Sequence, residues 1–147
     1  MPGTADTSSP IWERLPNAPI DQDNRAFYEG WPVHELRVQK CADCSKWHMP
    51  PRTICPFCWS FNVVPTAVSG RGRVYLFIIL SQGIESPGVT YPYPVVTIEL
   101  EEQPALRFTS TMVDCALSDI KIDMPVELAW IDRSGVPFPA FRPRRGA

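Results

Sequence analysis

Long hydrophobic segments are missing from the sequence. The longest apolar run extends from Val74 to Leu80, which is the length of a β-strand, whereas a transmembrane helix needs about 18 consecutive apolar residues. The N-terminal residues are small and polar, without the basic start and apolar centre of a secretory signal peptide. We therefore expect a cytoplasmic protein that does not enter a membrane.

The chain also lacks an excess of basic charge. Its 14 Lys and Arg residues stand against 16 Asp and Glu residues, which gives a net charge of -2. Phosphate backbones attract proteins with a broad basic face, and the nearest approach to one is the C-terminal group Arg142, Arg144 and Arg145. A solvated terminus explains these arginines better than a nucleic-acid arm, so we do not expect nucleic acid as a partner.

Catalytic motifs are equally scarce. The sequence has no paired carboxylates in an acid–base setting, no nucleophile elbow and no phosphate-binding loop. Residues 69–73 contain two glycines and two arginines, but they precede a strand pattern and therefore lack the helix terminus that binds phosphate. A tight turn is the favoured interpretation. A phosphate contact from Arg71 or Arg73 is the alternative, because Arg matches phosphate with two parallel hydrogen bonds.

Prolines, in contrast, are abundant. There are 17 of them, spread along the chain, and they favour many short elements joined by stiff turns. Residues 1–19 are rich in Pro, Ser, Thr and Asp, which predicts a loose N-terminal arm. We expect a mainly β protein whose C-terminal part is a five-stranded OB-type barrel. Its strands are predicted over residues 71–80, 95–101, 106–113, 126–131 and 138–141, with a helical turn over 116–120.

The strand predicted over residues 71–80 has apolar residues on both of its faces. This pattern is typical of a strand that is covered on both sides, so we expect further protein to pack outside the barrel wall here. The connection that follows, residues 82–94, is too long for a simple hairpin turn and contains Tyr91 and Tyr93. Loops of this length are frequently functional.

A short helix is predicted over residues 21–31, with Asp21 or Asp23 at its start and a stop at Gly30. Phe27 and Trp31 are four residues apart and share one face, with Tyr28 beside them. Three aromatic residues on so short a helix must pack somewhere. Docking on the chain's own core is the favoured interpretation, and a ligand or partner surface is the alternative.

Four of the five cysteines form a regular pattern. Cys41 and Cys44 are one C-x-x-C pair, and Cys55 and Cys58 are a second pair ten residues further on. Each pair places two thiolates on one tight turn, and two such turns complete a tetrahedral four-thiolate site. We predict a structural Zn²⁺ in a zinc ribbon; iron in a rubredoxin-like site is the main alternative, and disulfides are disfavoured in a reducing compartment.

The remaining cysteine, Cys115, stands apart in an apolar stretch without a neighbouring base. A buried free thiol is the favoured interpretation, and a nucleophile is the alternative. The chain has two histidines, His34 and His48, both in or beside the ribbon. Four cysteines already complete the site, so we expect both histidines on the ribbon surface.

An aromatic helix, a ribbon of this spacing and an OB-like barrel, in this order, resemble one known family. It is the family of acyl-CoA-associated proteins that join a rubredoxin-like zinc ribbon to an OB-fold, long catalogued as a domain of unknown function. No single segment is specific, but their order is. The segments that carry the resemblance are 27–30, 50–52 before Cys55-Pro56, 70–75, 93–100, 122–126 and 139–143.

The sequence departs from the family at two turns. The family frequently has Gly-Met before the penultimate strand, where this chain has Asp123-Met124. A glycine that usually follows an acidic pair is also missing, and Gln103-Pro104 stands in its place. The resemblance divides the chain into an arm with the aromatic helix (1–32), the zinc ribbon (33–68) and the OB-fold (69–147).

The resemblance implies a non-catalytic accessory subunit of an acyl-CoA-processing enzyme. The expected partner is a thiolase-fold aldolase, thiolase or acyltransferase, or a hotdog-fold hydratase, acting on fatty-acid, sterol side-chain or related lipid substrates. The subunit would stabilise this partner in a hetero-oligomer and help to bind the acyl-CoA. The residues expected to contact the partner or the acyl-CoA are Phe27, Tyr28, Trp31, Arg71, Arg73, Tyr91 and Tyr93.

Two other classes of function stay open at this point. Zinc ribbons and OB barrels both serve as single-stranded nucleic-acid-binding modules, which use stacking aromatic residues and a basic groove. This chain has the aromatic residues but not the basic groove. A stand-alone enzyme is the other alternative, although a closed four-cysteine site cannot activate water.

Overall fold

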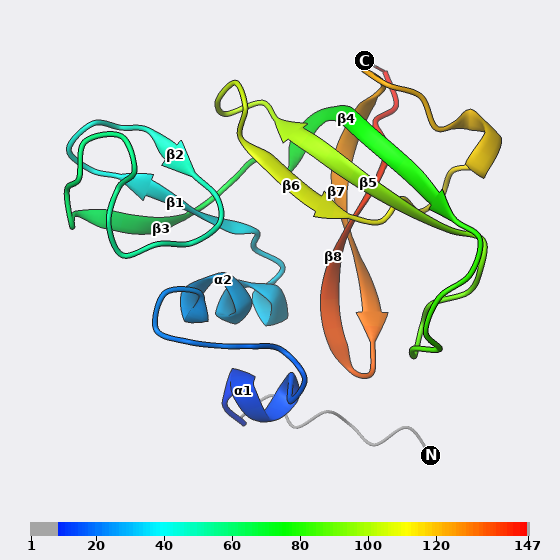
Figure 1. Ribbon diagram of the computed structural model, residues 1–147, viewed down its shortest axis with the longest axis horizontal. Coiled ribbons are helices and arrows are strands. Elements are labelled where there is room, and N and C mark those ends of the chain that lie inside the picture. The colour runs from blue at the N-terminus through cyan, green and yellow to red at the C-terminus, as the bar shows by residue number, and fades with distance from the viewer. Residues whose placement is uncertain (1–8, 147) are drawn as a thin grey trace. The chain divides into compact units, whose positions relative to one another are not determined.

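The computed structural model describes residues 9–146 and divides them into two compact units (Figure 1). The first unit comprises the described residues up to Val68 together with Asp132–Phe138. The second comprises Ser69–Ile131 and the described residues from Pro139 onward. Across residues 9–146, no helix has the length and apolar character needed to cross a membrane.

The first unit begins with two short helices, α1 (Ile11–Arg14) and α2 (Arg25–Gly30). Helix α1 lies within the segment that the sequence predicts to be a loose arm, and residues 1–8 of that arm lie outside the described residues. The apolar side chain of Ile11 is buried, and the guanidinium of Arg25 lies 4.4 Å from the centre of the Trp12 ring. These two contacts explain why part of the arm is ordered against the unit.

Helix α2 is shorter than its sequence predicts. The carboxylate of Asp21 accepts hydrogen bonds from the backbone N–H groups of Asp23 (2.8 Å) and Asn24 (3.0 Å). It therefore stabilises a turn ahead of the helix, as Asp side chains frequently do, and the α-helix starts only at Arg25.

Helix α2 also ends for a different reason from the one that the sequence predicts. Gly30 keeps a helical conformation, with φ −70°, and a 3₁₀ turn, η1 (Trp31–Val33), follows it. The chain reverses at His34, which has a left-handed φ of 58°. Gly30 is needed for a different reason: a Cβ atom at this position would overlap the carbonyl oxygen of Glu35, whose N–H bonds back to the Gly30 carbonyl at 2.9 Å.

Three antiparallel strands form the sheet of the ribbon, in the order β2-β1-β3. They are β1 (Arg37–Cys41), β2 (Trp47–His48) and β3 (Val63–Ala67). Strand β1 is central: Lys40 pairs with Trp47 on one side, and Cys41 pairs with Val63 on the other. Leu36 and Val38 are fully buried and supply its small core.

The second unit is built on a five-stranded antiparallel sheet in the order β6-β5-β4-β7-β8, except that the end of β7 and the start of β8 fall within Asp132–Phe138 of the first unit (Figure 1). A parallel bridge between Met112 and Phe141 joins the chain after β6 to β8 and curls the sheet on itself. Two hydrogen bonds support the closure, from the N–H of Val113 to the Phe141 carbonyl (2.8 Å) and from the N–H of Phe141 to the Thr111 carbonyl (2.9 Å). The elements are β4 (Arg71–Leu80), β5 (Tyr93–Leu100), β6 (Arg107–Ser110), η2 (Leu117–Asp119), β7 (Pro125–Arg133) and β8 (Val136–Pro143).

This curled sheet confirms the prediction of a mainly β protein with an OB-like barrel. Side chains that point inward from four of the strands fill its core without any exposure to solvent: Val74, Val96, Ile98, Val126 and Phe141. Alternation of buried and partly exposed residues along β5 supplies two of them, as expected for a strand with one face on the core.

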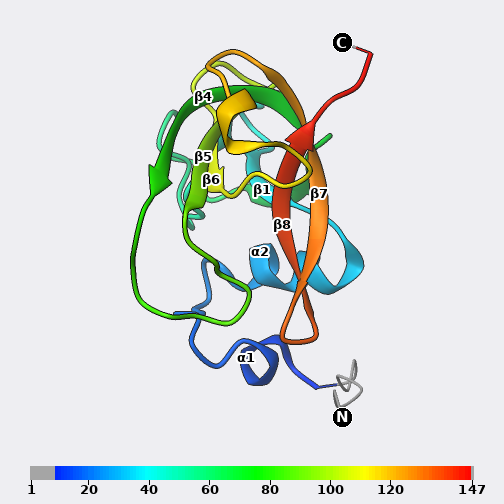
Figure 2. The ribbon, with the colours of Figure 1, turned by 90° about the vertical axis from the view of Figure 1, so that its right-hand side faces the viewer.

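Strand β4 does not match the expectation of cover on both faces. Its first half is central in the sheet and buries Gly72 and Val74. In its second half Tyr75, Leu76, Ile78 and Ile79 are all exposed, although they are apolar. Figure 2 shows the far parts of β4 and β5 diverging from β7 and β8. Within residues 9–146 the chain covers them only in part, with the guanidinium of Arg107 3.5 Å from the centre of the Tyr75 ring.

Candidate metal centre

The two C-x-x-C pairs lie on two similar turns. Cys41 ends strand β1, and the N–H of Ser45 donates to its carbonyl at 2.9 Å. In the second turn, the N–H of Trp59 donates to the carbonyl of Cys55 at 2.9 Å. Ser45 and Trp59 both have a left-handed φ of 62°. Each turn therefore reverses just after its second cysteine, which brings the four thiols to one place.

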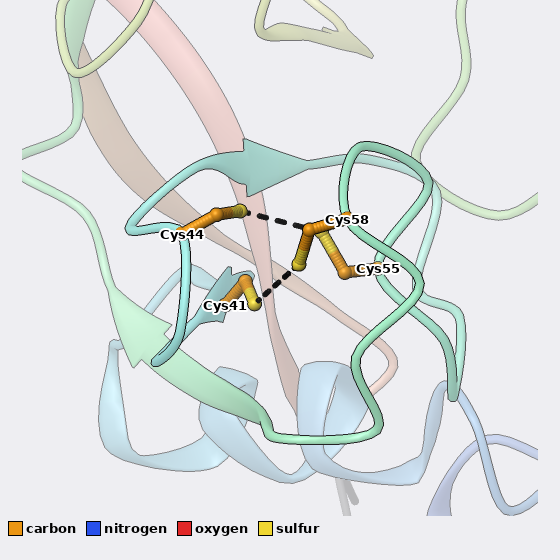
Figure 3. A group of neighbouring side chains, drawn as sticks. All are labelled: Cys41, Cys44, Cys55 and Cys58. Carbon is orange, nitrogen blue, oxygen red and sulfur yellow. Dashed lines mark hydrogen bonds between the residues drawn. The ribbon is translucent and has the colours of Figure 1, made fainter.

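The sulfur atoms point toward one another (Figure 3). All four Sγ atoms lie within 4.8 Å of one another, and the Cys41–Cys58 and Cys44–Cys55 pairs are both 3.6 Å apart. A tetrahedral zinc ion with Zn–S bonds of about 2.3 Å needs S–S separations of about 3.8 Å. The cluster therefore fits a closed four-thiolate zinc site, as the sequence predicts.

The electrostatics of the cluster also require a cation. Backbone N–H groups, that of Cys44 first, lower the pKa of Cys41 to about 7. The backbone N–H of Ser60 favours the Cys58 thiolate too, yet burial and the neighbouring cysteines raise the pKa of Cys58 to about 12. Four thiols so close together cannot all ionise without a positive ion between them, and zinc supplies that charge.

Polar contacts outside the cysteines hold the first turn to the rest of the ribbon. The hydroxyl of Ser60 and, at 3.3 Å, the side-chain amide of Asn62 both donate to the carboxylate of Asp43. The Ser60 hydroxyl, and then the Asn62 amide, keep the pKa of Asp43 below its usual value. Asp43 lies between Cys41 and Cys44, so these contacts orient the turn that carries both thiols.

The histidines and Cys115 do not join this site. His48 is buried, not on the ribbon surface as expected, because its strand pairs with the central strand β1. Burial lowers the pKa of His48 and so favours the neutral imidazole. Burial, and secondarily Asp119, raises the pKa of Cys115. Both histidines belong to the first unit and Cys115 to the second, so the unit of Cys115 offers no imidazole that would activate it.

The aromatic residues of α2 form a cluster of edge-to-face contacts. Trp31 lies with its ring centre 4.9 Å from Tyr28, 5.6 Å from Phe27 and 5.4 Å from Phe138 of the same unit. Phe27 and Trp31 are only 7% and 8% exposed, whereas Tyr28 is partly exposed. The chain's own packing thus accounts for Phe27 and Trp31, and Tyr28 is the member that offers surface to another molecule.

The two candidate arginines both have partners in the second unit. The guanidinium of Arg71 forms an ion pair with the carboxylate of Glu101 at 2.5 Å. Arg73 donates to the backbone carbonyl of Asp123 at 3.1 Å, and it lines a pocket of about 310 Å³ that also contains Glu101 and Arg144. A phosphate would have to displace Glu101 from Arg71, whereas Arg73 keeps its charge available.

The candidate tyrosines lie at the end of the long β4–β5 connection. The hydroxyl of Tyr91 donates to the carbonyl of Ile84 at 3.0 Å and so folds the loop across itself. Residues 85–87 and 89–91 line a shallow hollow of about 700 Å³ in this loop. Tyr93 is the first residue of β5. The structure therefore brings both tyrosines and Arg73 into one unit, but it places the α2 aromatic residues in the other.

A third group of aromatic residues, not predicted from the sequence, lies on and just after the second cysteine turn. Phe57, Trp59 and Phe61 are all exposed, Trp59 at 79% of its surface. The ammonium of Lys46 lies 5.1 Å from the centre of the Phe57 ring. The available signal was the presence of three aromatic residues within five positions, because aromatic residues concentrate at interfaces.

Two domain families match successive parts of the chain. The ChsH2 rubredoxin-like zinc ribbon domain matches residues 29–64, and the ChsH2 C-terminal OB-fold domain matches residues 65–131. Together with the thiol geometry, the first match identifies the metal as zinc.

Three relatives show how this pair of domains occurs elsewhere. The chain is 33% identical over 129 residues to a probable enoyl-CoA hydratase alpha subunit of Thermomonospora curvata, covering 87% of this chain and 40% of that protein. It is 33% identical over 114 residues to the 3-oxo-4,17-pregnadiene-20-carboxyl-CoA hydratase alpha subunit of Mycobacterium tuberculosis, covering 76% and 34%. A DUF35 domain-containing scaffold protein of Methanothermobacter thermautotrophicus is 32% identical over 98 residues, covering 66% and 72%. The chain thus spans well under half the length of both hydratase subunits.

A solved structure provides the fold comparison. A chain of the Ltp2-ChsH2(DUF35) aldolase superposes with a TM-score of 0.78 at 33% sequence identity, covering 86% of this chain and 98% of that chain. Fold and sequence agree over nearly the whole of the matched chain. The protein therefore belongs to the ChsH2 (DUF35) family, in which a rubredoxin-like zinc ribbon is joined to an OB-fold domain.

Proposed function

We propose that the chain is a non-catalytic accessory subunit of an acyl-CoA-processing enzyme complex. The observation that carries this proposal is the likeness to the solved aldolase chain, because it extends over 98% of that chain. The archaeal relatives of similar extent are named scaffold proteins, which agrees with a role in assembly. The partner enzyme would be a thiolase-fold aldolase or a related enzyme of lipid degradation.

In this proposal Cys41, Cys44, Cys55 and Cys58 are the four ligands of a structural zinc ion. The metal supplies folding free energy to a ribbon whose own core is small, and chemistry is left to the partner. A compartment that keeps thiols reduced suits such a site, so we place the complex in the cytoplasm.

The acyl-CoA contacts are proposed for the second unit. Arg73 is the best candidate for a CoA phosphate, because Arg71 is already paired with Glu101. Tyr91, which lines the hollow of the long loop, and Tyr93, which begins β5 after it, are proposed to contact an acyl or pantetheine chain. Tyr28, with the buried Phe27 and Trp31 behind it, is proposed as a contact to the partner enzyme.

The names of two relatives favour a second type of partner. Both relatives are named as alpha subunits of hydratases, and both names specify a CoA ester. This chain matches only a part of each. The chain would then assemble with a hydratase subunit instead of an aldolase.

Co-purification with reconstitution tests the proposal and separates the two partners. The tagged chain is isolated from its native lysate, the co-purifying enzyme is identified by mass spectrometry, and both are expressed separately. We expect about one zinc per chain, no turnover of acyl-CoA by the chain alone, and aldol cleavage or hydration that needs both proteins. Turnover by the chain alone would make it the enzyme and would refute the proposal. Salt-sensitive binding of single-stranded DNA without any enzyme partner would support the nucleic-acid alternative.

A further inference from the structure

The second half of β4 combines an apolar composition with exposure on both faces. Tyr75 and Ile79 are 43% and 36% exposed, and Leu76 and Ile78 are 43% and 51% exposed. Successive residues of a strand point to opposite faces, so both faces of this segment keep exposed apolar surface. The chain covers it only in part, with the guanidinium of Arg107 3.5 Å from the centre of the Tyr75 ring. We call residues 75–80 the distal β4 segment.

One edge of the distal β4 segment is also unpaired. Strand β7 pairs with β4 only from Arg71 to Arg73, and two further hydrogen bonds join Val74 to Met124 (3.1 Å) and Asp123 (2.8 Å). Beyond Val74, no strand within residues 9–146 pairs with this edge. The other edge stays paired with β5 as far as Leu80.

A bulge marks the point where the pairing changes. The register between β4 and β5 shifts between Val74 and Leu76, and a bulge of this kind bends a strand and strengthens its twist. Figure 2 shows the resulting separation of β4 from β7. The bulge directs the distal segment out of the barrel wall, so the unpaired edge is a built feature of the fold.

The segment and the loop and strand that follow it carry almost no charge of their own, and Arg107 beside Tyr75 is a charged neighbour from β6. From Val74 to Ile98 the sequence contains one charged residue, Glu85. Natural proteins protect exposed strand edges with lysines, prolines or very short strands, yet this edge has none of these over residues 75–80. An unprotected edge that persists in a protein is suited to strand addition, in which main-chain hydrogen bonds supply affinity and side-chain pockets supply specificity.

We propose that the distal β4 segment binds an edge strand of the acyl-CoA enzyme, which extends the sheet of this chain into its partner. This inference rests on the proposed function. The occupant is assigned to the enzyme because a chain of the same architecture is found in a solved aldolase together with a second protein, Ltp2. The recognised strand is apolar and uncharged, since a buried unpaired charge opposite Ile78 or Leu76 would be costly.

The loop that follows β4 enlarges this surface. A stable interface buries about 800 Å² on each partner, which is more than a six-residue strand provides. Ile84 in the loop is 86% exposed, and it adjoins the segment in the sequence. The loop held by Tyr91 therefore forms the outer part of the interface, with the strand pairing at its centre.

A matched pair of lysine substitutions tests the proposal. Ile78→Lys changes the distal segment, whereas Ile122→Lys changes an isoleucine of the same unit that is equally exposed, at 53% against 51%. The probe is the recombinant enzyme identified with the wild-type chain. Ile78→Lys is expected to weaken its binding by about tenfold or more, and Ile122→Lys is expected to leave binding unchanged. Equal binding of wild type and Ile78→Lys would overturn the proposal and leave the proposed function standing.

A photo-crosslinking amino acid in place of Ile78 provides a second measurement that does not depend on a loss of binding. A crosslink to a strand of the enzyme supports the proposal. A crosslink to a second copy of this chain would overturn it and make the segment a homodimer interface. If the wild-type chain binds no acyl-CoA enzyme at all, the proposed function fails, and the assignment of the segment to an enzyme fails with it.

Discussion

The turn between β5 and β6 provides a sharp test of the backbone geometry. Ala105 has a left-handed φ of 65°, which is costly for a residue with a Cβ atom, by about 1–2 kcal/mol. Its side chain is exposed, and its N–H donates to the carboxylate of Glu99 at 3.1 Å. Ala105→Gly removes the strain and keeps this hydrogen bond, because the backbone donates it.

The gain is partly offset in the unfolded chain. Glycine has more conformational freedom there, which costs about 0.4–1 kcal/mol on folding. The net expectation for Ala105→Gly is a stabilisation of about 0.5–1 kcal/mol. For a chain of this size, that raises the midpoint of thermal unfolding by about 2–3 °C.

Ala116 is the matched control for this prediction. It is also an exposed alanine of the second unit, but its φ of −65° and ψ of 142° are ordinary for any residue. Ala116→Gly relieves no strain and pays the entropic cost alone, so it should lower the midpoint. The assay is thermal unfolding of the zinc-loaded protein followed by circular dichroism. If Ala105→Gly lowers the midpoint as much as Ala116→Gly does, the reasoning from the left-handed conformation is refuted.

Three further predictions concern the metal, the core and the sheet. Cys55→Ser should abolish zinc binding and unfold the ribbon, whereas Cys115→Ser should retain about one zinc per chain by elemental analysis. Phe141→Ala removes a fully buried ring and should reduce the free energy of unfolding by about 3–5 kcal/mol in urea titrations; a loss below 1 kcal/mol would contradict its central place in the core. Gly72→Ala places a Cβ atom against the carbonyl of Glu99 and should weaken β4–β5 pairing, seen as faster amide hydrogen exchange in both strands.

The metal site was predictable from the sequence because its geometry is local. Two cysteines separated by two residues must lie on one turn, and the thiols then need only a second such turn. The closure of the sheet was less accessible, since the bridge between Met112 and Phe141 joins distant parts of the chain. The strand pattern indicated five strands, but not which of them would meet.

The residues that cover the aromatic face of helix α2 could not be predicted from the sequence. The spacing of Phe27 and Trp31 indicates one apolar face, but it does not say what covers that face. Phe138, far along the chain, supplies an edge-to-face contact to Trp31 in the same unit. The same spacing would have been seen for a surface that binds a partner.

The departures from the family have a physical explanation in the turns. Asp123 stands where the family frequently has glycine, and it has a left-handed φ of 63°. Asp tolerates this conformation better than most residues, so the turn is kept without glycine. In the other turn, the glycine is missing after Glu101-Glu102 and the left-handed position falls on Ala105. Both substitutions keep the turn at some cost in stability.

Both units expose apolar side chains that folding of the isolated chain does not require to be exposed. A structural zinc ion contributes about 10–16 kcal/mol to folding in small zinc domains, so the ribbon does not depend on burying every aromatic side chain. Trp59 illustrates this: it is 79% exposed and in a left-handed conformation where glycine would be less strained. The distal β4 segment likewise has the composition of a strand covered on both sides, but the chain covers it only in part. Stability of the isolated chain explains neither feature, whereas burial against another protein explains both.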